Sequence, residues 1–286
     1  MMRRLLYIII VVLCAACTHR PEHFTIEVLN GYTPVKNQGN SQTCWAYAML
    51  AAIETEHIMR GDSVHLSVAF VENAVRHEPR APRSLRGMGM TTVNLIQKYG
   101  LVPYDAMPQG DTLPPHLAFM FGVEYKLQEF ARSVCAPGEY TGYGTNHHQP
   151  YYQTFEPQLA DNWEHNRLMN LPADSLVRLT ERAVRNGHGV CWEGDTSEPG
   201  FNWAEGYAVN TLWTGTTSDN HCMAIVGIAH DETGQKYFIM KNSWGTNNRY
   251  KGLMYMSFDY FHRKTIAVYL SRDIFSPSFC RYFPKK

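Results

Sequence analysis

Among the residues of this sequence that could do covalent chemistry, Cys44 stands where such chemistry is favoured. Apolar residues recur at three- and four-residue intervals from Trp45 to Ile53, so we expect a helix that begins at Cys44 and stops at Gly61. The unpaired N–H groups and the dipole at a helix start stabilise a thiolate. A nearby imidazolium would lower the thiol pKa further and protonate a leaving amine. The position of Cys44 therefore predicts a nucleophilic thiol.

Such a thiol also needs an imidazole, a partner for the second ring nitrogen, and donors for a developing oxyanion. Three short segments contain these groups, and they run in the order Gln38 to Tyr47, Asn220 to Ala224, and Lys241 to Gly245. The first reads QGNSQTCWAY, the second NHCMA and the third KNSWG. Together they resemble the nucleophile, histidine and asparagine segments of the papain-like cysteine peptidases.

The resemblance implies a role for each matching residue. Cys44 would be the nucleophile, His221 the base, Asn242 the residue that orients the imidazole, and Gln38 an oxyanion donor together with the Cys44 N–H. Peptide bonds would be hydrolysed through a thioester acyl-enzyme, without metal or organic cofactor. Trp244 would shield the histidine–asparagine hydrogen bond from water.

A closer likeness is to the bleomycin hydrolase and aminopeptidase C branch, which makes aminopeptidase action one possibility. It spans roughly residues 30 to 270 and rests on four segments: Thr33 to Gln38, Lys98 to Pro103, Asn170 to Pro172, and Trp192 to Asp195. The chain is much shorter than typical members of that branch. Their hexameric ring and their C-terminal tail in the cleft are therefore not carried over, and Phe279 to Lys286 matches no motif.

Two departures from the papain pattern concern the nucleophile loop and the spacing. Ser41 stands where the papain signature has a second Cys, so one disulfide is missing and we expect the loop to be held by packing. His221 follows Cys44 by 177 positions, against about 130–150 in papain-type chains. The irregular segment 103–172 can absorb that excess.

Residues beside these motifs have plainer interpretations. We expect Trp45 to pack in the core rather than touch substrate, and Cys222 to be a packing residue rather than a redox centre. Asp219 and Asn220 either contact substrate or form a turn before a strand. Glu193 and Asp195 are expected to be structural or solvated.

The order of elements predicts an α+β fold of the papain-like kind, with a helical subdomain packed against an antiparallel β subdomain and a cleft between them. Helices are expected near 66–71, 91–99, 118–133 and 174–186, the last capped by Asp174 and followed by Gly187. Short β-rich runs then follow at 189–192, 221–229, 236–241, 252–258 and 265–270, with a turn at 231–234. The helical subdomain would occupy mainly 30–188 and the β subdomain mainly 189–272, within a peptidase domain of residues 18–286.

The first residues indicate export. Arg3 and Arg4 precede an apolar run from Leu5 to Ala16, which is short for a bilayer span and ends directly before Cys17. This pattern resembles a bacterial lipoprotein signal over residues 1–17, with Cys17 acylated. Plain secretion and a retained anchor are the alternatives. We expect an exported protein held on a membrane by lipid, facing the periplasm or the outer surface.

Composition narrows the remaining possibilities. Lys+Arg and Asp+Glu both number 26, and no basic stretch indicates a nucleic-acid surface. Cys44, Cys135, Cys191, Cys222 and Cys280 are left after the signal, so at least one thiol is unpaired, and without a C-x-x-C pair structural zinc is not expected. The partner would be a peptide or protein substrate, and the oligomeric state is open. A catalytically silent papain-fold binding protein and a structural envelope lipoprotein are the competing hypotheses.

Overall fold

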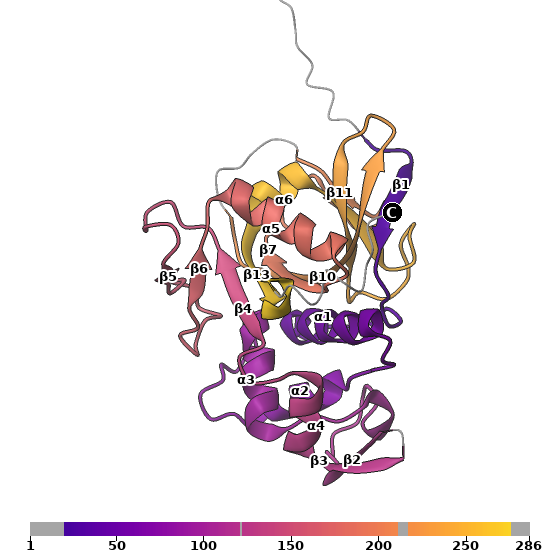
Figure 1. The fold of residues 1–286 in the computed structure, drawn as a ribbon, viewed down its shortest axis with the longest axis vertical. Helices are drawn as coiled ribbons and strands as arrows, with labels where there is room; N and C mark the ends of the chain where they lie inside the picture. Colours follow the sequence, from indigo (N-terminus) through magenta and orange to yellow (C-terminus); the bar gives the residue numbers. More distant parts are fainter. Residues whose placement is uncertain (1–19, 121, 211–216, 276–286) are drawn as a thin grey trace, which may run out of the picture.

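The computed structural model describes residues 20–120, 122–210 and 217–275. Two lobes lie one above the other, and α1 runs along the seam between them (Figure 1). The helices are α1 (Cys44–Arg60), α2 (Val68–Arg76), α3 (Gly89–Tyr99), α4 (Leu127–Val134), α5 (Ala173–Arg185) and α6 (Phe258–Lys264), with short 3-10 turns η1 (Tyr104–Ala106) and η2 (Arg272–Phe275).

The upper lobe is built on an 11-stranded sheet with the order β5-β6-β4-β13-β7-β10-β11-β12-β9-β8, and β1 pairs with β10 outside this path. Its pairs are antiparallel except β4 with β6 and β9 with β12. Its strands are β1 (Phe24–Leu29), β4 (Tyr140–Gly144), β5 (Thr154–Phe155), β6 (Leu168–Asn170), β7 (Val190–Gly194), β8 (Phe201–Asn202), β9 (Tyr207–Ala208), β10 (His221–Asp231), β11 (Lys236–Lys241), β12 (Leu253–Ser257) and β13 (Thr265–Ser271). The lower lobe adds a hairpin of β2 (Leu117–Met120) and β3 (Val123–Lys126).

Side-chain alternation along the strands divides the core between the two faces of the sheet. On β7 and β10, Trp192, Met223 and Ile225 pack with residues of α5 and α6. Their neighbours Cys191 and Cys222 point the other way and join the core formed by α1 to α4. The sheet therefore presents one face to α1, which carries Cys44 at its first position.

The α+β class and most of the predicted elements are confirmed. α1 begins at Cys44 and ends before Gly61, which adopts φ 94° as a left-handed cap. The turn after β10 is fixed by Asp231, whose Oδ1 accepts from the backbone N–H groups of Thr233 at 2.8 Å and Gln235 at 3.0 Å.

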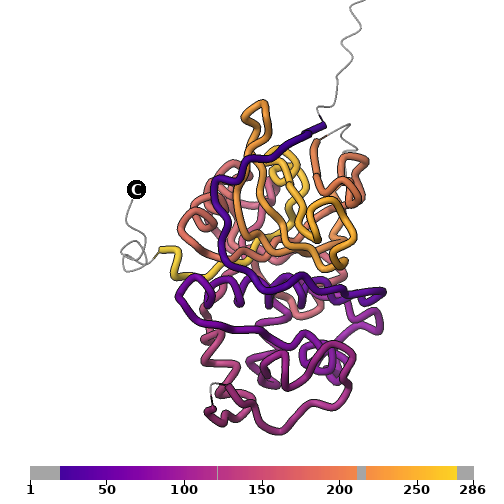
Figure 2. Tube along the Cα trace, turned by 90° about the vertical axis from the view of Figure 1, so that its right-hand side faces the viewer, coloured from indigo at the N-terminus to yellow at the C-terminus, as the bar shows by residue number. Residues whose placement is uncertain are grey.

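Two expectations about elements are wrong. The helix expected over 118–133 is a hairpin followed by the short α4, because Gly122 turns the chain at φ 77°. Asp174 lies in the first turn of α5 and does not cap it, since Pro172 holds the cap position. No element was predicted before Tyr32, where the structure has β1, which descends along the upper lobe before the chain reaches α1 (Figure 2).

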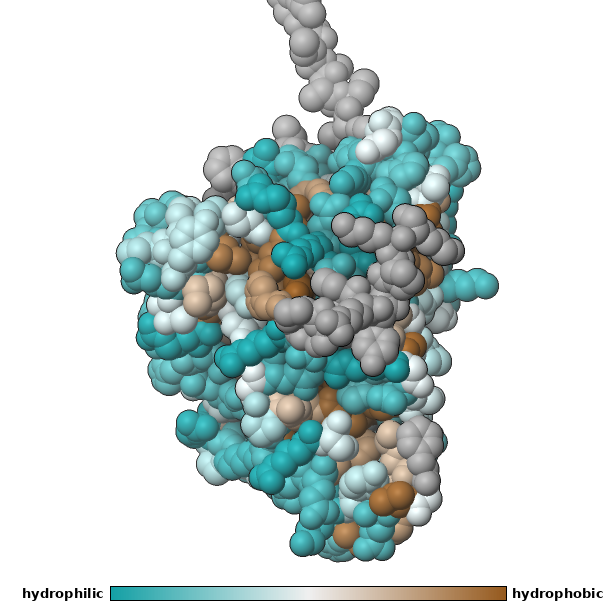
Figure 3. All heavy atoms as spheres, viewed as in Figure 1, coloured by the Kyte–Doolittle hydropathy of each residue, from teal (hydrophilic) through white to brown (hydrophobic). Residues whose placement is uncertain are grey.

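Hydrophilic side chains cover most of the face shown in Figure 3. Within the described ranges, no helix combines the length and apolar character needed to cross a bilayer. The signal at 1–17 with Cys17, and the tail with Cys280, lie outside the described residues.

Candidate active site

Cys44 lies at the N-terminus of α1, on the wall of an open hollow between the lobes. The hollow measures about 320 Å³ and is lined also by Gln38, Asn220, His221 and Trp244. Residues that are far apart in the sequence thus line the same hollow. The helix start is supplied by α1, the imidazole by the first residue of β10, and the indole by the loop after β11.

His221 and Asn242 are joined by a hydrogen bond of 2.7 Å between Nε2 and Oδ1. Because Oδ1 only accepts, the imidazole carries its proton on Nε2, and Nδ1 is left for Cys44. Both residues are buried. Asn242 Oδ1 also accepts from the Ser243 N–H at 2.7 Å, which holds the amide in this orientation.

Trp244 covers this pair. Its ring centroid lies 4.4 Å from that of His221, with the planes inclined by 31°. Trp203 and Phe201 pack edge-on against the indole and keep it in place. Trp45, by contrast, is a core residue as expected, 1% exposed, with its indole N–H donating to the Leu85 carbonyl at 3.1 Å.

Hydrogen bonds around the Cys44 sulfur favour its ionised form. A hydrogen bond from the Cys222 side chain, followed by a hydrogen bond and the charge of His221, holds the pKa of Cys44 well below its usual value, although burial works in the opposite direction. The Cys222 backbone N–H also donates to the sulfur. The first of these contacts was not expected, because Cys222 was interpreted as packing alone.

Gln38 is held by the asparagine segment. Its backbone N–H donates to the Ser243 carbonyl at 2.7 Å, and its Oε1 accepts from Ser243 Oγ at 2.6 Å. Its Nε2 donates to the Ser41 carbonyl at 2.7 Å. An amide nitrogen carries two N–H donors, so this contact leaves one that can serve an oxygen in the hollow.

The nucleophile loop is tied down by hydrogen bonds as well as by packing. Ser41 Oγ and Thr43 Oγ1 donate to Glu72 Oε1 of α2, at 2.9 Å and 2.5 Å. Ser41 thus occupies the position of the missing disulfide cysteine and anchors the loop through Glu72. The expectation of packing alone was incomplete, because nothing in the spacing of Glu72 indicated this contact.

A buried acid pair lies beside the site. Burial raises the pKa of Glu193 well above its usual value and that of Asp219 to about 7. Glu193 Oε1 and Asp219 Oδ2 are buried without a hydrogen-bond partner. Two neighbouring buried carboxyl groups cannot both ionise, so one of them keeps its proton. Arg86 binds the Asp219 carbonyl at 2.6 Å and the Asp161 carboxylate at 2.5 Å. Glu193 was expected to be structural or solvated, and it is fully buried.

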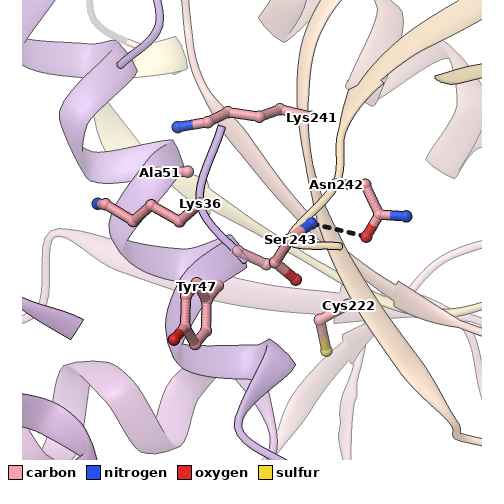
Figure 4. A pocket seen from close by; sticks show the side chains of 8 residues that line it. Lys36, Tyr47, Ala51, Cys222, Lys241, Asn242 and Ser243 are labelled. Atoms are coloured by element: carbon pink, nitrogen blue, oxygen red, sulfur yellow. Dashed lines mark hydrogen bonds between the residues drawn. The ribbon is translucent and has the colours of Figure 1, made fainter. Parts of the chain in front are cut away.

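A second buried cluster lies behind Asn242. Glu54 of α1 binds Lys36 at 3.1 Å, lies 3.7 Å from Lys241, and accepts from the Leu66 N–H at 2.8 Å and from Thr33. Figure 4 shows the two ammonium groups on one side of a small cavity, and Cys222 at its other end. Burial lowers the pKa of Lys241 to about 8. In the sequence, the signal that could have indicated this cluster is a lysine in each of two motif segments, Lys36 after Thr33 and Lys241 before Asn242.

In the described part of the chain, no group of three or more His, Cys, Asp or Glu side chains is arranged to hold a metal ion.

The chain is similar to several known proteases. Residues 178–271 match the family described as papain family cysteine protease. The structure superimposes on PepW from Lactobacillus rhamnosis HN001 with a TM-score of 0.65 at 17% identity, covering 90% of this chain and 84% of that one. The fold is papain-like. Bromelain from Ananas comosus in complex with the E64 inhibitor gives 0.52 at 18% identity over 84% of this chain and 94% of that one. Procathepsin L 3 of Tenebrio molitor gives 0.55 at 19% identity over 85% and 69%.

A relative by sequence is much longer. Serine-repeat antigen protein 5 of Plasmodium falciparum is 24% identical over 224 residues, which is 74% of this chain and 21% of that protein. The chain therefore spans about a fifth of the length of the curated relatives that it matches.

Proposed function

We propose that this chain is a cysteine-type peptidase that hydrolyses peptide bonds through a thioester acyl-enzyme. The observation that carries the proposal is that Cys44, at the first position of α1, and His221 line the same open hollow. There the neighbouring Cys222 and His221 hold the pKa of Cys44 well below its usual value. The His221 ring is in turn bound by Asn242. The papain-like fold and the family match over residues 178–271 support it.

In the first half-reaction, the Cys44 thiolate attacks the carbonyl carbon of the scissile bond. The Cys44 N–H and the second N–H of Gln38 Nε2 stabilise the oxyanion. His221 gives its Nδ1 proton to the leaving amine, and the acyl group stays on Cys44 as a thioester. Asn242 keeps the imidazole in the tautomer and orientation that this transfer needs.

In the second half-reaction, neutral His221 takes a proton from water, and the resulting hydroxide attacks the thioester carbonyl. The carboxylic acid product leaves, and the thiolate–imidazolium pair is restored. Trp244 contributes by excluding water from the bond between His221 and Asn242, because that bond is stronger in a dry environment.

Labelling and turnover test the proposal together. An epoxide inhibitor of thiol peptidases should label wild-type protein once, at Cys44, and abolish cleavage of a peptide library. Cys44→Ala should neither be labelled nor hydrolyse peptides, while Cys135→Ala, which changes a buried thiol on the α4 side, serves as the labelling control. Hydrolysis by Cys44→Ala at the wild-type rate would refute the proposal. Absence of both labelling and hydrolysis in the wild type would favour a binding or structural protein.

We further propose that the activity resembles that of the bleomycin hydrolase and aminopeptidase C branch, and that it includes removal of N-terminal residues. The support is the set of four segments that resemble that branch. A peptide library with free N-termini, compared with the same library acetylated at the N-termini, separates aminopeptidase action from internal cleavage. Release of N-terminal residues from the free peptides, and not from the acetylated ones, supports aminopeptidase action. Internal cleavage of both sets without release of N-terminal residues contradicts it.

We also propose that the protein is exported and anchored by lipid on Cys17. The support is the charged start, the apolar run and the small residues before Cys17. Radiolabelled fatty acid should be incorporated into the wild type and not into Cys17→Ala. Equal incorporation in both would contradict the anchor.

A further inference from the structure

The loop before Cys44 is fixed to the lower lobe through one oxygen atom. Ser41 Oγ and Thr43 Oγ1 both donate to Oε1 of Glu72, at 2.9 Å and 2.5 Å, and the two hydroxyl oxygens lie 2.5 Å apart. Glu72 belongs to α2, which lies in the lower lobe and packs on α1 (Figure 1). Because Thr43 is fully buried, its hydroxyl depends on these neighbours for hydrogen bonds.

The backbones of these two anchored residues place both of the proposed oxyanion donors. The Ser41 carbonyl accepts from Gln38 Nε2 at 2.7 Å, and this contact directs the second N–H of the same amide. The Ser41 N–H in turn donates to the Gln38 carbonyl at 3.1 Å. The other donor, the Cys44 N–H, belongs to the peptide group that follows Thr43. A shift of Ser41 and Thr43 would therefore displace both donors together.

Thr43 also departs from the usual behaviour of a threonine that precedes a helix. Such a threonine normally has an extended backbone, and its hydroxyl accepts an N–H of the first turn. Thr43 instead has φ −102° and ψ 28°, and its side chain makes no capping hydrogen bond. Its hydroxyl lies against Glu72 and Ser41, while the Ala46 N–H donates to the Thr43 carbonyl at 2.9 Å. Glu72 thus holds the residue before Cys44 in a conformation that capping alone would not give.

We propose that Glu72 is a positioning residue for peptide hydrolysis, which holds the oxyanion donors of Gln38 and Cys44 in place from the lower lobe. This inference rests on the proposed function. Glu72 does not line the hollow, so it acts on the reaction through the loop and not by touching substrate. Because the oxyanion exists only during the reaction, loss of the anchor should lower kcat and kcat/KM equally and leave KM unchanged.

The test compares Glu72→Leu with Glu72→Gln. Leucine removes the acceptor, whereas glutamine keeps one carbonyl oxygen, which can serve both hydroxyls because both already bind a single oxygen. Glu72→Leu should lower kcat about 10–10²-fold at unchanged KM, and Glu72→Gln should keep the wild-type kcat. Asn73→Ala is the matched control on the same helix, because Asn73 donates to the Thr112 carbonyl and not to the loop. Its kcat should equal that of the wild type.

Alkylation of Cys44 by iodoacetamide separates loss of positioning from damage to the thiol, because this reaction forms no oxyanion. Its rate and its pH dependence should be the same in the wild type and in Glu72→Leu. The proposal is overturned if Glu72→Leu has the kcat of the wild type. It is also overturned if alkylation of this variant slows in proportion to kcat, since Glu72 would then act on the thiol or on the fold as a whole.

Hydrogen exchange distinguishes failure of this proposal from failure of the proposed function. The Ser41 N–H should exchange several-fold faster in Glu72→Leu than in the wild type and in Glu72→Gln, whether or not peptides are cleaved. A wild type that cleaves no peptide would refute the proposed function, while this difference in exchange would still support Glu72 as the anchor of the loop. Equal exchange in the wild type and Glu72→Leu would overturn the anchor even in an active peptidase.

Discussion

Replacing Glu54 by Gln should destabilise the protein far more than its single charge suggests. Glu54 is fully buried on α1 and serves two lysines, Lys36 from the loop before the helix and Lys241 from the end of β11. The charges of these lysines hold the pKa of Glu54 below its usual value against its burial. Glutamine keeps the size, but Leu66 and Thr33 donate to different oxygens of Glu54. The single amide oxygen of glutamine can accept from one of them, so the change removes the charge and one acceptor.

The magnitude depends on what Lys241 does afterwards. Leaving a buried partner charge uncompensated costs about 3–5 kcal/mol. Lys241 can limit this cost by releasing its proton, because its pKa is already about 8, and one pKa unit corresponds to about 1.4 kcal/mol. We therefore expect a loss of about 2–4 kcal/mol at pH 7, and a fall in Tm of about 5–15 °C.

The pH dependence of this loss has a definite sign. In both proteins the folded pKa of Lys241 lies below its unfolded value of about 10.4, so the unfolded state binds more protons and stability rises with pH above the folded pKa. Without Glu54 the folded pKa of Lys241 falls below 8, so the stability of the variant begins to rise at a lower pH than that of the wild type. The difference in unfolding free energy between the two proteins should therefore become smaller as pH rises toward 8.

Urea unfolding followed by tryptophan fluorescence, at pH 6, 7 and 8, measures both effects. Glu181→Gln is the matched control, because Glu181 also binds two cations, Arg185 and Lys236, each at 2.9 Å, but at the surface. Its loss should be about 0–1 kcal/mol. The reasoning is refuted if Glu54→Gln costs no more than Glu181→Gln.

Three further changes test other parts of the account. Asn242→Ala should lower kcat/KM about 10²-fold while Cys44 remains open to alkylation; an unchanged kcat/KM would remove Asn242 from the mechanism. The pKa of Asp219 is raised to about 7, so between about pH 4 and 7 the folded state holds a proton that the unfolded state has released, and the wild-type Tm should fall as pH rises. Asp219→Asn should make this fall in Tm smaller; an equal slope of Tm against pH in both proteins would contradict the reasoning. Gly189→Ala should cost about 1–3 kcal/mol in urea unfolding, because its Cβ would lie 2.4 Å from the Ala52 carbonyl oxygen; unchanged stability would contradict the close packing of α1 on the sheet.

Strong local patterns predicted the elements that hold the site. The period from Trp45 to Ile53 and the Gly61 stop predicted α1, whose bounds the structure reproduces. The β-rich runs near His221 and Asn242 are β10 and β11. These patterns could be recognised because α1 combines helical spacing of large apolar residues with a glycine stop, whereas β10 and β11, buried on both faces, are nearly continuous apolar runs.

Other features could not be predicted because they arise from distant contacts. β1 is largely exposed, apolar Ile26 and Leu29 included, and it is a strand because it pairs with β10. Glu72, Glu54 and Cys222 gained their roles through contacts with residues far along the chain or across the seam. A single sequence gives such residues no local signature, so tertiary packing had to reveal them.

The central claim is that the surroundings of Cys44 ionise its thiol, and the rate of alkylation by iodoacetamide against pH measures this most directly. We predict that Cys44 in the wild type reacts with an apparent pKa far below the ordinary value of about 8.5, and that His221→Ala raises it. An apparent pKa near that ordinary value in the wild type, unchanged by loss of His221, would contradict the account.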